Sequence, residues 1–222
     1  MLRNIDLKEI SDGRFYDIND MVKAGCDDCS GCWDCCQGMG DSIFLDPLDI
    51  YRLTTELECT FDQLLETCVD LHVVEGIILP NMRMVGKEEK CAFLNEQGRC
   101  NIHSIRPGIC RLFPLGRCYE ENSFKYFFQV HECKKAKTKV KVKKWIDTPE
   151  IKKNEEYIIA WHEFQKKLQE ILESFSNEAM VKKINMYVLE QFFRKPYDGT
   201  HDFYEQFEVR LKLAKRYVGI AG

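Results

Sequence analysis

Five cysteines lie within eleven residues near the start of the chain, and this density is the first chemical signal of the sequence. They are Cys26, Cys29, Cys32, Cys35 and Cys36. Disulfide bonds cannot pair all of them, because a disulfide holds two Cα atoms about 5.5 Å apart and a bond between adjacent Cys35 and Cys36 would be strained. Thiolates that converge on a metal face no such obstacle, since two-residue gaps let the backbone curl and point several sulfurs inward. The segment therefore predicts half of a metal site.

The other half is expected in a later set of cysteines. Cys91 and Cys100 flank a glycine-containing turn, Cys110 follows ten residues later, and Cys133 lies in the segment Val-His-Glu-Cys. The pair Pro107-Gly108 predicts a tight turn that presents Cys110. With this set the candidate metal ligands become nine thiols.

Polar side chains near Cys100 and Cys110 are predicted to support the site. Arg106 and Arg111 could balance the negative charge of thiolates, or could form ordinary salt bridges, and both interpretations stay open. His103 is expected to be a hydrogen-bonded group beside the metal rather than a ligand, because nine thiols already suffice. The remaining cysteines are expected to be small buried apolar side chains: Cys59, Cys68 and Cys118.

Several motifs in a fixed order resemble the YkgJ-like cysteine-cluster family. Besides the first cluster with its terminal Cys35-Cys36 pair, they are Asp49, Arg52, Cys91-x-Phe-Leu, Cys100-x-Ile-His, Arg106-Pro-x-x-Cys110-Arg and Phe113-Pro114. The resemblance covers about residues 26–133 and implies a domain that chelates zinc or iron. The family pattern is usually written with three residues before the cysteine pair, whereas this chain has two and carries Cys26 as an additional thiol.

The same domain occurs in flagellin lysine N-methylases, so the resemblance also implies methyl transfer as a candidate activity. A glycine-rich strand–turn–helix segment for S-adenosylmethionine is not recognisable in the sequence. Ser-His-Asp, HExxH, P-loop and paired-carboxylate arrangements are not recognisable either. We therefore favour a non-enzymatic role and leave catalysis open.

Two metals compete for the cysteines. Cys26, Cys29, Cys32 and Cys36 have gaps of two, two and three residues, which is the bacterial ferredoxin spacing, although Gln37 stands where ferredoxins have proline. Zinc needs four ligands for each tetrahedral site, so eight thiols could build two sites. The close spacing of the first three cysteines favours an iron–sulfur cluster, with [4Fe–4S] as the first candidate and zinc as the alternative.

Composition points to a reducing compartment. The chain has 222 residues and a formal net charge of −4. This charge is mild and does not indicate any class of binding partner. Residues 1–20 lack the apolar core of a signal peptide, and no stretch approaches the roughly 20 apolar residues of a membrane helix. We expect a cytoplasmic protein without membrane contact, in which twelve cysteines favour metal over disulfides.

A basic segment follows Cys133, with seven lysines between residues 134 and 144. Its Lys-Val-Lys-Val alternation is typical of a charged edge strand, because charged edges block aggregation. Nucleic-acid binding is therefore not expected.

Local signals predict short elements in the front of the chain. Residues 1–25 are expected to be an irregular lead-in, and helices are expected to begin at Asp46-Pro47 and at Thr60. Strands are predicted over residues 42–45 and 124–130, and a hairpin or two short strands over 71–85, with Pro80-Asn81 between two apolar runs.

The C-terminal part has apolar residues at three- and four-residue steps, which predicts three helices over about residues 148–175, 178–194 and 202–218. The expected fold is α+β and mostly helical: an irregular, cysteine-rich front with short strands, then a three-helix segment. We divide it into a metal-cluster domain (1–133), a basic linker or edge segment (134–147) and a helical segment packed on it (148–222).

The sequence thus predicts a metal-cluster protein with a redox, sensory or accessory role. The alternatives are a zinc-binding structural or interaction protein and a metal-dependent enzyme similar to the N-methylases. The helical segment is the candidate surface for a protein partner.

Overall fold

The computed structural model describes residues 7–26, 29 and 32–220, and its fold is α+β. Backbone contacts divide the chain into two compact units, neither of which is continuous in sequence. Unit 1 comprises residues 1–40 and 84–155, and unit 2 comprises residues 41–83 and 156–222. The cysteine-rich, basic and helical divisions expected from the sequence stay a prediction.

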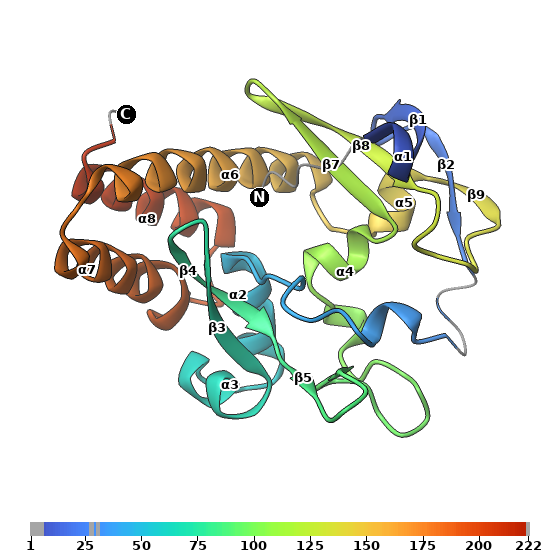
Figure 1. Ribbon diagram of the computed structural model, residues 1–222, viewed down its shortest axis with the longest axis horizontal. Coiled ribbons are helices and arrows are strands. Elements are labelled where there is room, and N and C mark those ends of the chain that lie inside the picture. The colour runs from blue at the N-terminus through green and yellow to red at the C-terminus, as the bar shows by residue number, and fades with distance from the viewer. Residues whose placement is uncertain (1–6, 27–28, 30–31, 221–222) are drawn as a thin grey trace. The chain divides into compact units, whose positions relative to one another are not determined.

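A three-stranded antiparallel sheet forms the centre of unit 1, with the strand order β1-β8-β7 (Figure 1). The strands span Ser11–Tyr16 (β1), Ser123–Gln129 (β8) and Leu115–Glu120 (β7). Gly116 lies opposite Phe127, and a Cβ atom at residue 116 would stand 2.3 Å from the Phe127 ring, so this register requires glycine. One side of the sheet packs into a core that includes Tyr16, Leu112, Leu115, Tyr126 and Phe128.

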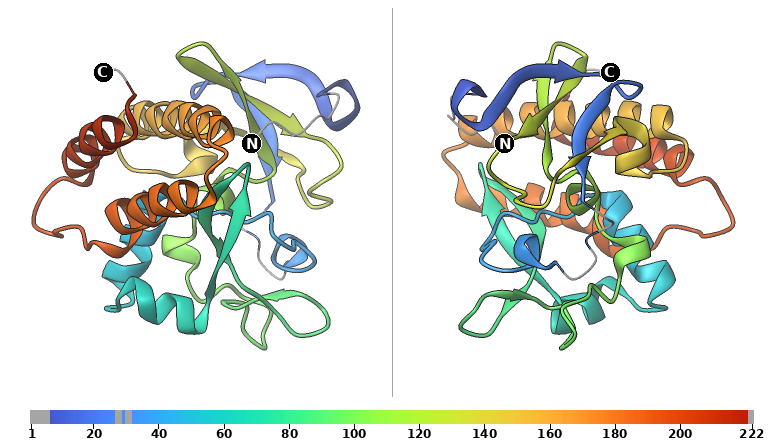
Figure 2. Two further views of the ribbon diagram at one scale, coloured as in Figure 1. Left: turned by 60° about the vertical axis from the view of Figure 1, so that its left-hand side comes forward. Right: turned by 90° about the vertical axis from the view of Figure 1, so that its right-hand side faces the viewer.

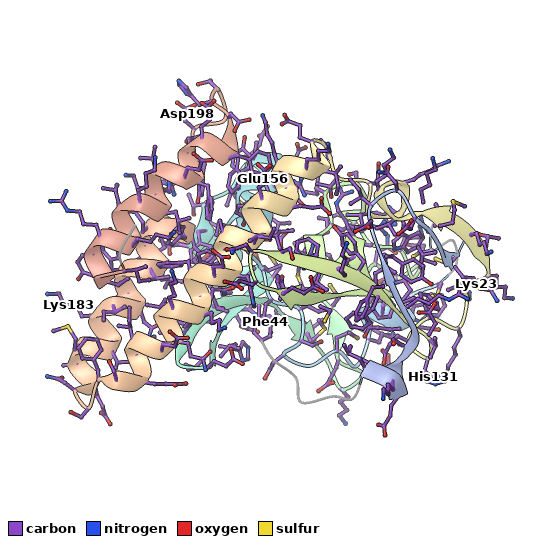
Figure 3. All side chains as sticks on the ribbon, turned by 90° about the horizontal axis from the view of Figure 1, so that it is seen from above. Lys23, Phe44, His131, Glu156, Lys183 and Asp198 are labelled. Carbon is purple, nitrogen blue, oxygen red and sulfur yellow. The ribbon has the colours of Figure 1, made fainter. Side chains whose placement is uncertain are left out.

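A two-stranded ribbon of β2 (Met21–Gly25) and β9 (Thr138–Lys141) lies in the same unit, followed by helix α5 (Val142–Ile146). The basic segment therefore forms the predicted strand. Lys139 and Lys141 are exposed while Val140 turns inward, and Lys23 projects outward from β2 (Figure 3). The buried face of this region carries Val22, Ala24 and Val142. Solvation of the lysines and burial of the alternate residues account for the alternation.

Shorter elements complete unit 1. They are α1 (Leu7–Ile10), η2 (Asp34–Cys36), β5 (Met84–Val85), β6 (Lys90–Cys91), η3 (His103–Ile105) and α4 (Gly108–Leu112). Two expectations are wrong here. Residues 7–25 form α1, β1 and β2 instead of an irregular lead-in, whereas residues 1–6 lie outside the described part. Pro107-Gly108 does not make a tight turn: Pro107 is the N-cap of α4, which carries Cys110.

Unit 2 begins with two capped helices, α2 (Pro47–Glu56) and α3 (Phe61–Thr67). Asp46 and Asp49 form one capping box and Thr60 and Gln63 form the other, so both predicted helix starts are confirmed. The carboxylate of Asp49 accepts a hydrogen bond from the backbone N–H of Asp46 at 3.1 Å, which gives it a structural role.

The predicted hairpin is formed by β3 (Val69–Val74) and β4 (Ile77–Met82), but its turn lies elsewhere than expected. Glu75 and Gly76 both have positive φ, which is typical of the two-residue turns that match strand twist. Pro80-Asn81 lies inside β4. The expected strand over residues 42–45 is reduced to an isolated bridge between Phe44 and Asn81.

Three long helices complete unit 2 and confirm the predicted C-terminal segment (Figures 1 and 2). They are α6 (Ile151–Ser174, whose first five residues belong to unit 1), α7 (Glu178–Leu189, continued by the π-helical turn η4, Glu190–Arg194) and α8 (Phe203–Val218). Trp161 of α6 packs edge-on against Phe192 at 4.9 Å between ring centroids. The polar faces, which carry residues such as Lys183, point outward (Figure 3).

A buried amide joins the hairpin to α7 inside unit 2. Oδ1 of Asn185 accepts from the Ile78 N–H at 2.8 Å, and Nδ2 donates to the Gly76 carbonyl at 2.9 Å. Within the described part of the chain, no helix is both long and apolar enough to span a bilayer.

Candidate metal centre

All nine candidate thiols belong to unit 1, and backbone pairings place eight of them in two neighbouring groups, between which the charge of Cys35 raises the pKa of Cys29. The first group contains Cys26, Cys29, Cys32 and Cys133. The Sγ atoms of Cys26 and Cys29 lie 3.7 Å apart, and the thiols of Cys26 and Cys133 are hydrogen-bonded. The Cys32 N–H donates to the Cys29 carbonyl at 3.1 Å.

The β2–β9 ribbon positions the two remote ends of the first group. Cys26 follows β2 directly, and Cys133 precedes β9. The Lys137 N–H donates to the Gly25 carbonyl at 2.9 Å, and a Cβ atom at Gly25 would meet Thr138 Oγ1 at 2.2 Å. Close approach of the two backbones thus brings Cys133 beside Cys26, across more than a hundred residues of sequence. Residues 27–28 and 30–31, inside the cysteine segment, lie outside the described part.

The second group contains Cys35, Cys36, Cys91 and Cys100. An antiparallel bridge pairs Gln37 with Lys90, which places Cys36 opposite Cys91. The Gly38 N–H donates to the Glu89 carbonyl at 3.0 Å and extends this pairing. A second bridge, between Leu94 and Cys100, folds Cys100 back toward Cys91, whose carbonyl accepts from the Leu94 N–H at 2.9 Å.

The loop between Cys91 and Cys100 is held by a side-chain amide and by an aromatic ring. Asn95 Oδ1 accepts from the backbone N–H of Gln97 at 3.1 Å and of Arg99 at 2.8 Å. Gly98 has φ +69°, and a Cβ atom there would lie 2.4 Å from Cε3 of Trp33. The Trp33 ring therefore lies against the loop backbone, and only glycine allows that approach.

Backbone N–H groups point at several of the sulfurs. The Cys29 N–H donates to the Cys26 sulfur, the Ile102 N–H to Cys100, and the N–H groups of two residues after Cys133 to the Cys133 sulfur. Hydrogen bonds of this kind stabilise a thiolate, which is the form of cysteine that binds metal. They oppose burial, which raises the pKa of Cys26 to about 11. These donors offset part of the effect of burial, which remains the larger cause and raises the pKa of all three thiols.

Adjacent Cys35 and Cys36 differ in acidity. A hydrogen bond from the Cys36 thiol lowers the pKa of Cys35 to about 7. The same hydrogen bond raises the pKa of Cys36, and burial and the charges of Cys91 and Cys100 raise it further. Cys35 is the thiol of this pair that ionises first.

Arg106 supplies positive charge to both groups. Burial raises the pKa of Cys29 and Cys100, and the Arg106 guanidinium acts against this on both thiols. It also lowers the pKa of Cys35, after the hydrogen bond from Cys36. Arg106 Nη1 lies 2.9 Å from His103 Nε2. The buried Nε of Arg106 has no hydrogen-bond partner among the described residues. This placement is what a thiolate-balancing role requires.

Two further arginines have distinct positions. Arg111 donates to the backbone carbonyls of Arg106 at 3.1 Å and Asp147 at 2.8 Å, and also to that of Ser104, so it ties α4 to its surroundings. Sequence reasoning missed Arg99, which donates to the Cys29 carbonyl at 3.1 Å and bears on the pKa of Cys100. Its position directly before Cys100 was the available signal.

The remaining cysteines lie in other secondary-structure elements. Cys110, the ninth candidate ligand, lies on α4 of unit 1. Cys118 lies in β7, while Cys59 and Cys68 belong to unit 2, where Cys68 is buried as the C-cap of α3. Among the residues that the structure describes, no group of three or more Cys, His, Asp or Glu side chains is placed so that it could hold a metal ion.

The donor set nevertheless fits a thiophilic metal. Sulfurs bound to one tetrahedral ion at about 2.3 Å stand about 3.8 Å apart. The 3.7 Å separation of the Cys26 and Cys29 sulfurs agrees with this spacing. Soft thiolates select zinc, copper(I) and iron–sulfur clusters over hard cations such as magnesium or calcium.

Comparison with protein-family models identifies the family of this chain. A family model named CxxCxxCC, with the description "Putative zinc- or iron-chelating domain", covers residues 28–143, more than half of the chain. The name has two residues before the cysteine pair, as in Cys29, Cys32, Cys35 and Cys36, so the expected departure from the family pattern is wrong. No curated protein and no solved structure is significantly similar to the chain.

Proposed function

Because the chain belongs to the CxxCxxCC family of zinc- or iron-chelating domains, we propose that it is a metal-binding protein in which the thiolates of unit 1 hold an iron–sulfur cluster. One observation carries the proposal. Segments around Cys26–Cys36, Cys91–Cys100 and Cys133 bring eight thiols together, with backbone N–H donors and Arg106 directed at them.

The residues of the chain perform three tasks in this proposal. Eight thiols, as thiolates, provide the ligands, and the N–H donors beside Cys26, Cys100 and Cys133 fix the orientation of their sulfurs. Arg106 balances the accumulated negative charge. The bound group would link three distant segments and so supply folding free energy to unit 1, while an iron–sulfur cluster would in addition supply one-electron redox chemistry.

The allocation of cysteines supports an iron–sulfur cluster. In two-cluster ferredoxins the first three cysteines of the C-x2-C-x2-C-x3-C run bind one cluster and the fourth binds the other. Cys26, Cys29 and Cys32 lie together with the remote Cys133, whereas Cys36 lies with Cys91 and Cys100. The chain thus follows the ferredoxin division even though Gln37 replaces the proline.

Zinc is the second candidate, and the Cys26–Cys29 contact favours it. Sulfurs at 3.7 Å are spaced to share one ion, whereas the cysteines of a [4Fe–4S] cluster each bind a different iron. A zinc-filled site would be closed and structural, and the protein would then act as an interaction module.

We further propose a redox, sensory or accessory role in the reducing cytoplasm. All twelve cysteines are free thiols in the structure, which suits a compartment where thiols stay reduced.

The test is metal analysis of anaerobically purified protein, with iron, acid-labile sulfide and zinc counted on one sample beside its ultraviolet–visible spectrum. Broad absorbance near 400 nm with equal iron and sulfide would support the iron–sulfur proposal. A colourless protein with bound zinc would support the second candidate. A protein without metal from either anaerobic or aerobic preparation would refute the proposed function. Cys29→Ser should lose metal, and the matched Cys68→Ser variant should keep it.

A further inference from the structure

We infer that unit 1 holds two separate metal sites of four thiols each, and that the CxxCxxCC motif is divided between them. The first site is Cys26, Cys29, Cys32 and Cys133, and the second is Cys35, Cys36, Cys91 and Cys100. The inference rests on the proposed metal-binding function and adds the number of sites and their membership.

The number of thiols in each group is the first argument. A tetrahedral zinc site takes four ligands, and an iron–sulfur cluster with cysteine ligands also takes four. Each group therefore matches one complete site with either metal, and one metal could not use all eight thiols.

Backbone connections separate the groups. The first depends on the β2–β9 ribbon, through the 2.9 Å hydrogen bond from Lys137 N–H to the Gly25 carbonyl. The second depends on the Gln37–Lys90 and Leu94–Cys100 bridges. These two sets of pairings share no residue, and one side-chain hydrogen bond connects them, from Arg99 of the second group's loop to the Cys29 carbonyl at 3.1 Å.

The division falls inside the motif, between Cys32 and Cys35. Cys35 and Cys36 belong to the 3-10 turn η2, which the Cys36 N–H closes on the Trp33 carbonyl at 2.8 Å. Trp33 lies between this pair and Cys32, and its ring is directed at the Gly98 loop of the second group. A bulky side chain that packs on this loop holds η2 to the second group.

Arg106 explains how two anionic sites can be neighbours. Its guanidinium acts to lower the pKa of Cys29 in the first group and of Cys35 and Cys100 in the second. A positive charge that acts on thiolates of both sets offsets part of their mutual repulsion. The arginine connects the sites electrostatically without being a ligand of either.

The test counts metal in variants that each remove one remote ligand and leave the motif itself intact. Cys133→Ser should empty the first site, and Cys100→Ser the second, so each should keep about half of the wild-type metal. Cys118→Ser, in β7 of the same unit, is the matched control and should keep all of it. Zinc, iron and sulfide are measured on each protein after anaerobic purification.

Native mass spectrometry of the wild-type protein provides a measurement that does not depend on the variants folding. Two zinc ions or two clusters per chain, with an intermediate that carries one, would support separate sites. A wild-type protein with one metal group would overturn the inference, as would complete loss in both variants or full retention in Cys133→Ser. Wild-type protein without any metal would instead refute the proposed function, so the two failures are distinguishable.

Discussion

The close approach of Trp33 to Gly98 gives a quantitative prediction for Gly98→Ala. Gly98 has φ +69°, and an added Cβ atom would stand 2.4 Å from the indole ring. Placing alanine in the left-handed region costs about 1–2 kcal/mol, and displacing a packed ring costs about 1–3 kcal/mol more. Because the loop joins Cys91 to Cys100, this strain should weaken metal binding by the second group.

Gly86→Ala is the matched control. Gly86 lies between β5 and β6 with φ +73°, and nothing lies within 4 Å of the position where its Cβ atom would be. Both variants therefore share the backbone cost, and only Gly98→Ala adds the clash. The added 1–3 kcal/mol corresponds to metal affinity about 5- to 150-fold weaker than in the control.

The assay is competition for metal with a chelator of known affinity, followed by tryptophan fluorescence to report displacement of Trp33. Metal retention should decrease in the order wild type, Gly86→Ala, Gly98→Ala. Equal retention by the two variants within a factor of two would refute the argument that the Trp33–Gly98 contact holds the loop in its metal-binding shape.

Three other predictions concern single side chains. Asn185→Ala should lower the free energy of unfolding by about 1–2 kcal/mol in a urea titration, because it removes the hydrogen bonds that the buried Asn185 amide makes to the half-buried Ile78 N–H and to the Gly76 carbonyl. A change below about 0.5 kcal/mol, the size of an ordinary surface substitution, would contradict it. Burial lowers the pKa of His162 to about 4, so the folded state binds this proton less readily than the unfolded state, and the free energy of unfolding should fall as the pH drops from 6.5 toward 4. His162→Gln should reduce the loss of stability between pH 8 and pH 5. Identical pH profiles of stability for the variant and the wild type would argue against this. Arg106→Gln should reduce metal retention in both sites about tenfold in the chelator assay, because it removes the positive charge near the thiolates. Arg106→Lys keeps this charge and should retain most of the metal. Loss confined to one site would exclude an effect of Arg106 on both groups.

Local signals were sufficient for much of the secondary structure. The helices α6, α7 and α8 were predicted to within a few residues, because long amphipathic periodicity and residues such as Asn177 and Asp202 define them without reference to the rest of the chain. The capping boxes of α2 and α3 are equally local.

Long-range pairing could not be predicted in this way. The segment that forms β1 lacks the alternation of a strand and is defined by its partner β8, more than a hundred residues away. The turn of the β3–β4 hairpin was assigned to Pro80-Asn81, although Glu75-Gly76 forms it, because proline is a strong turn signal that the strand accommodates here. Nothing local indicates that residues 41–83 belong with the C-terminal helices.

The candidate site shows the same division. The types and number of cysteines identified the chemistry, since thiol density needs no tertiary information. Their grouping depends on the Gln37–Lys90 bridge and on the β2–β9 ribbon, which join residues far apart in sequence. Arg99 was missed for the same reason: its bond to the Cys29 carbonyl exists only in the folded chain.

The arrangement of the β2–β9 ribbon has a consequence during protein synthesis. Cys26 and Cys133 are separated by 107 residues, and the ribbon that joins them needs both strands. At about 5–20 residues per second of translation, the first three thiols wait about 5–20 s for their fourth partner. During that interval these three thiols lack their fourth partner and are accessible to oxidants and to competing metals. If the first group binds metal as proposed, its loading follows synthesis of Cys133, and the yield of loaded protein should rise when synthesis takes place without oxygen.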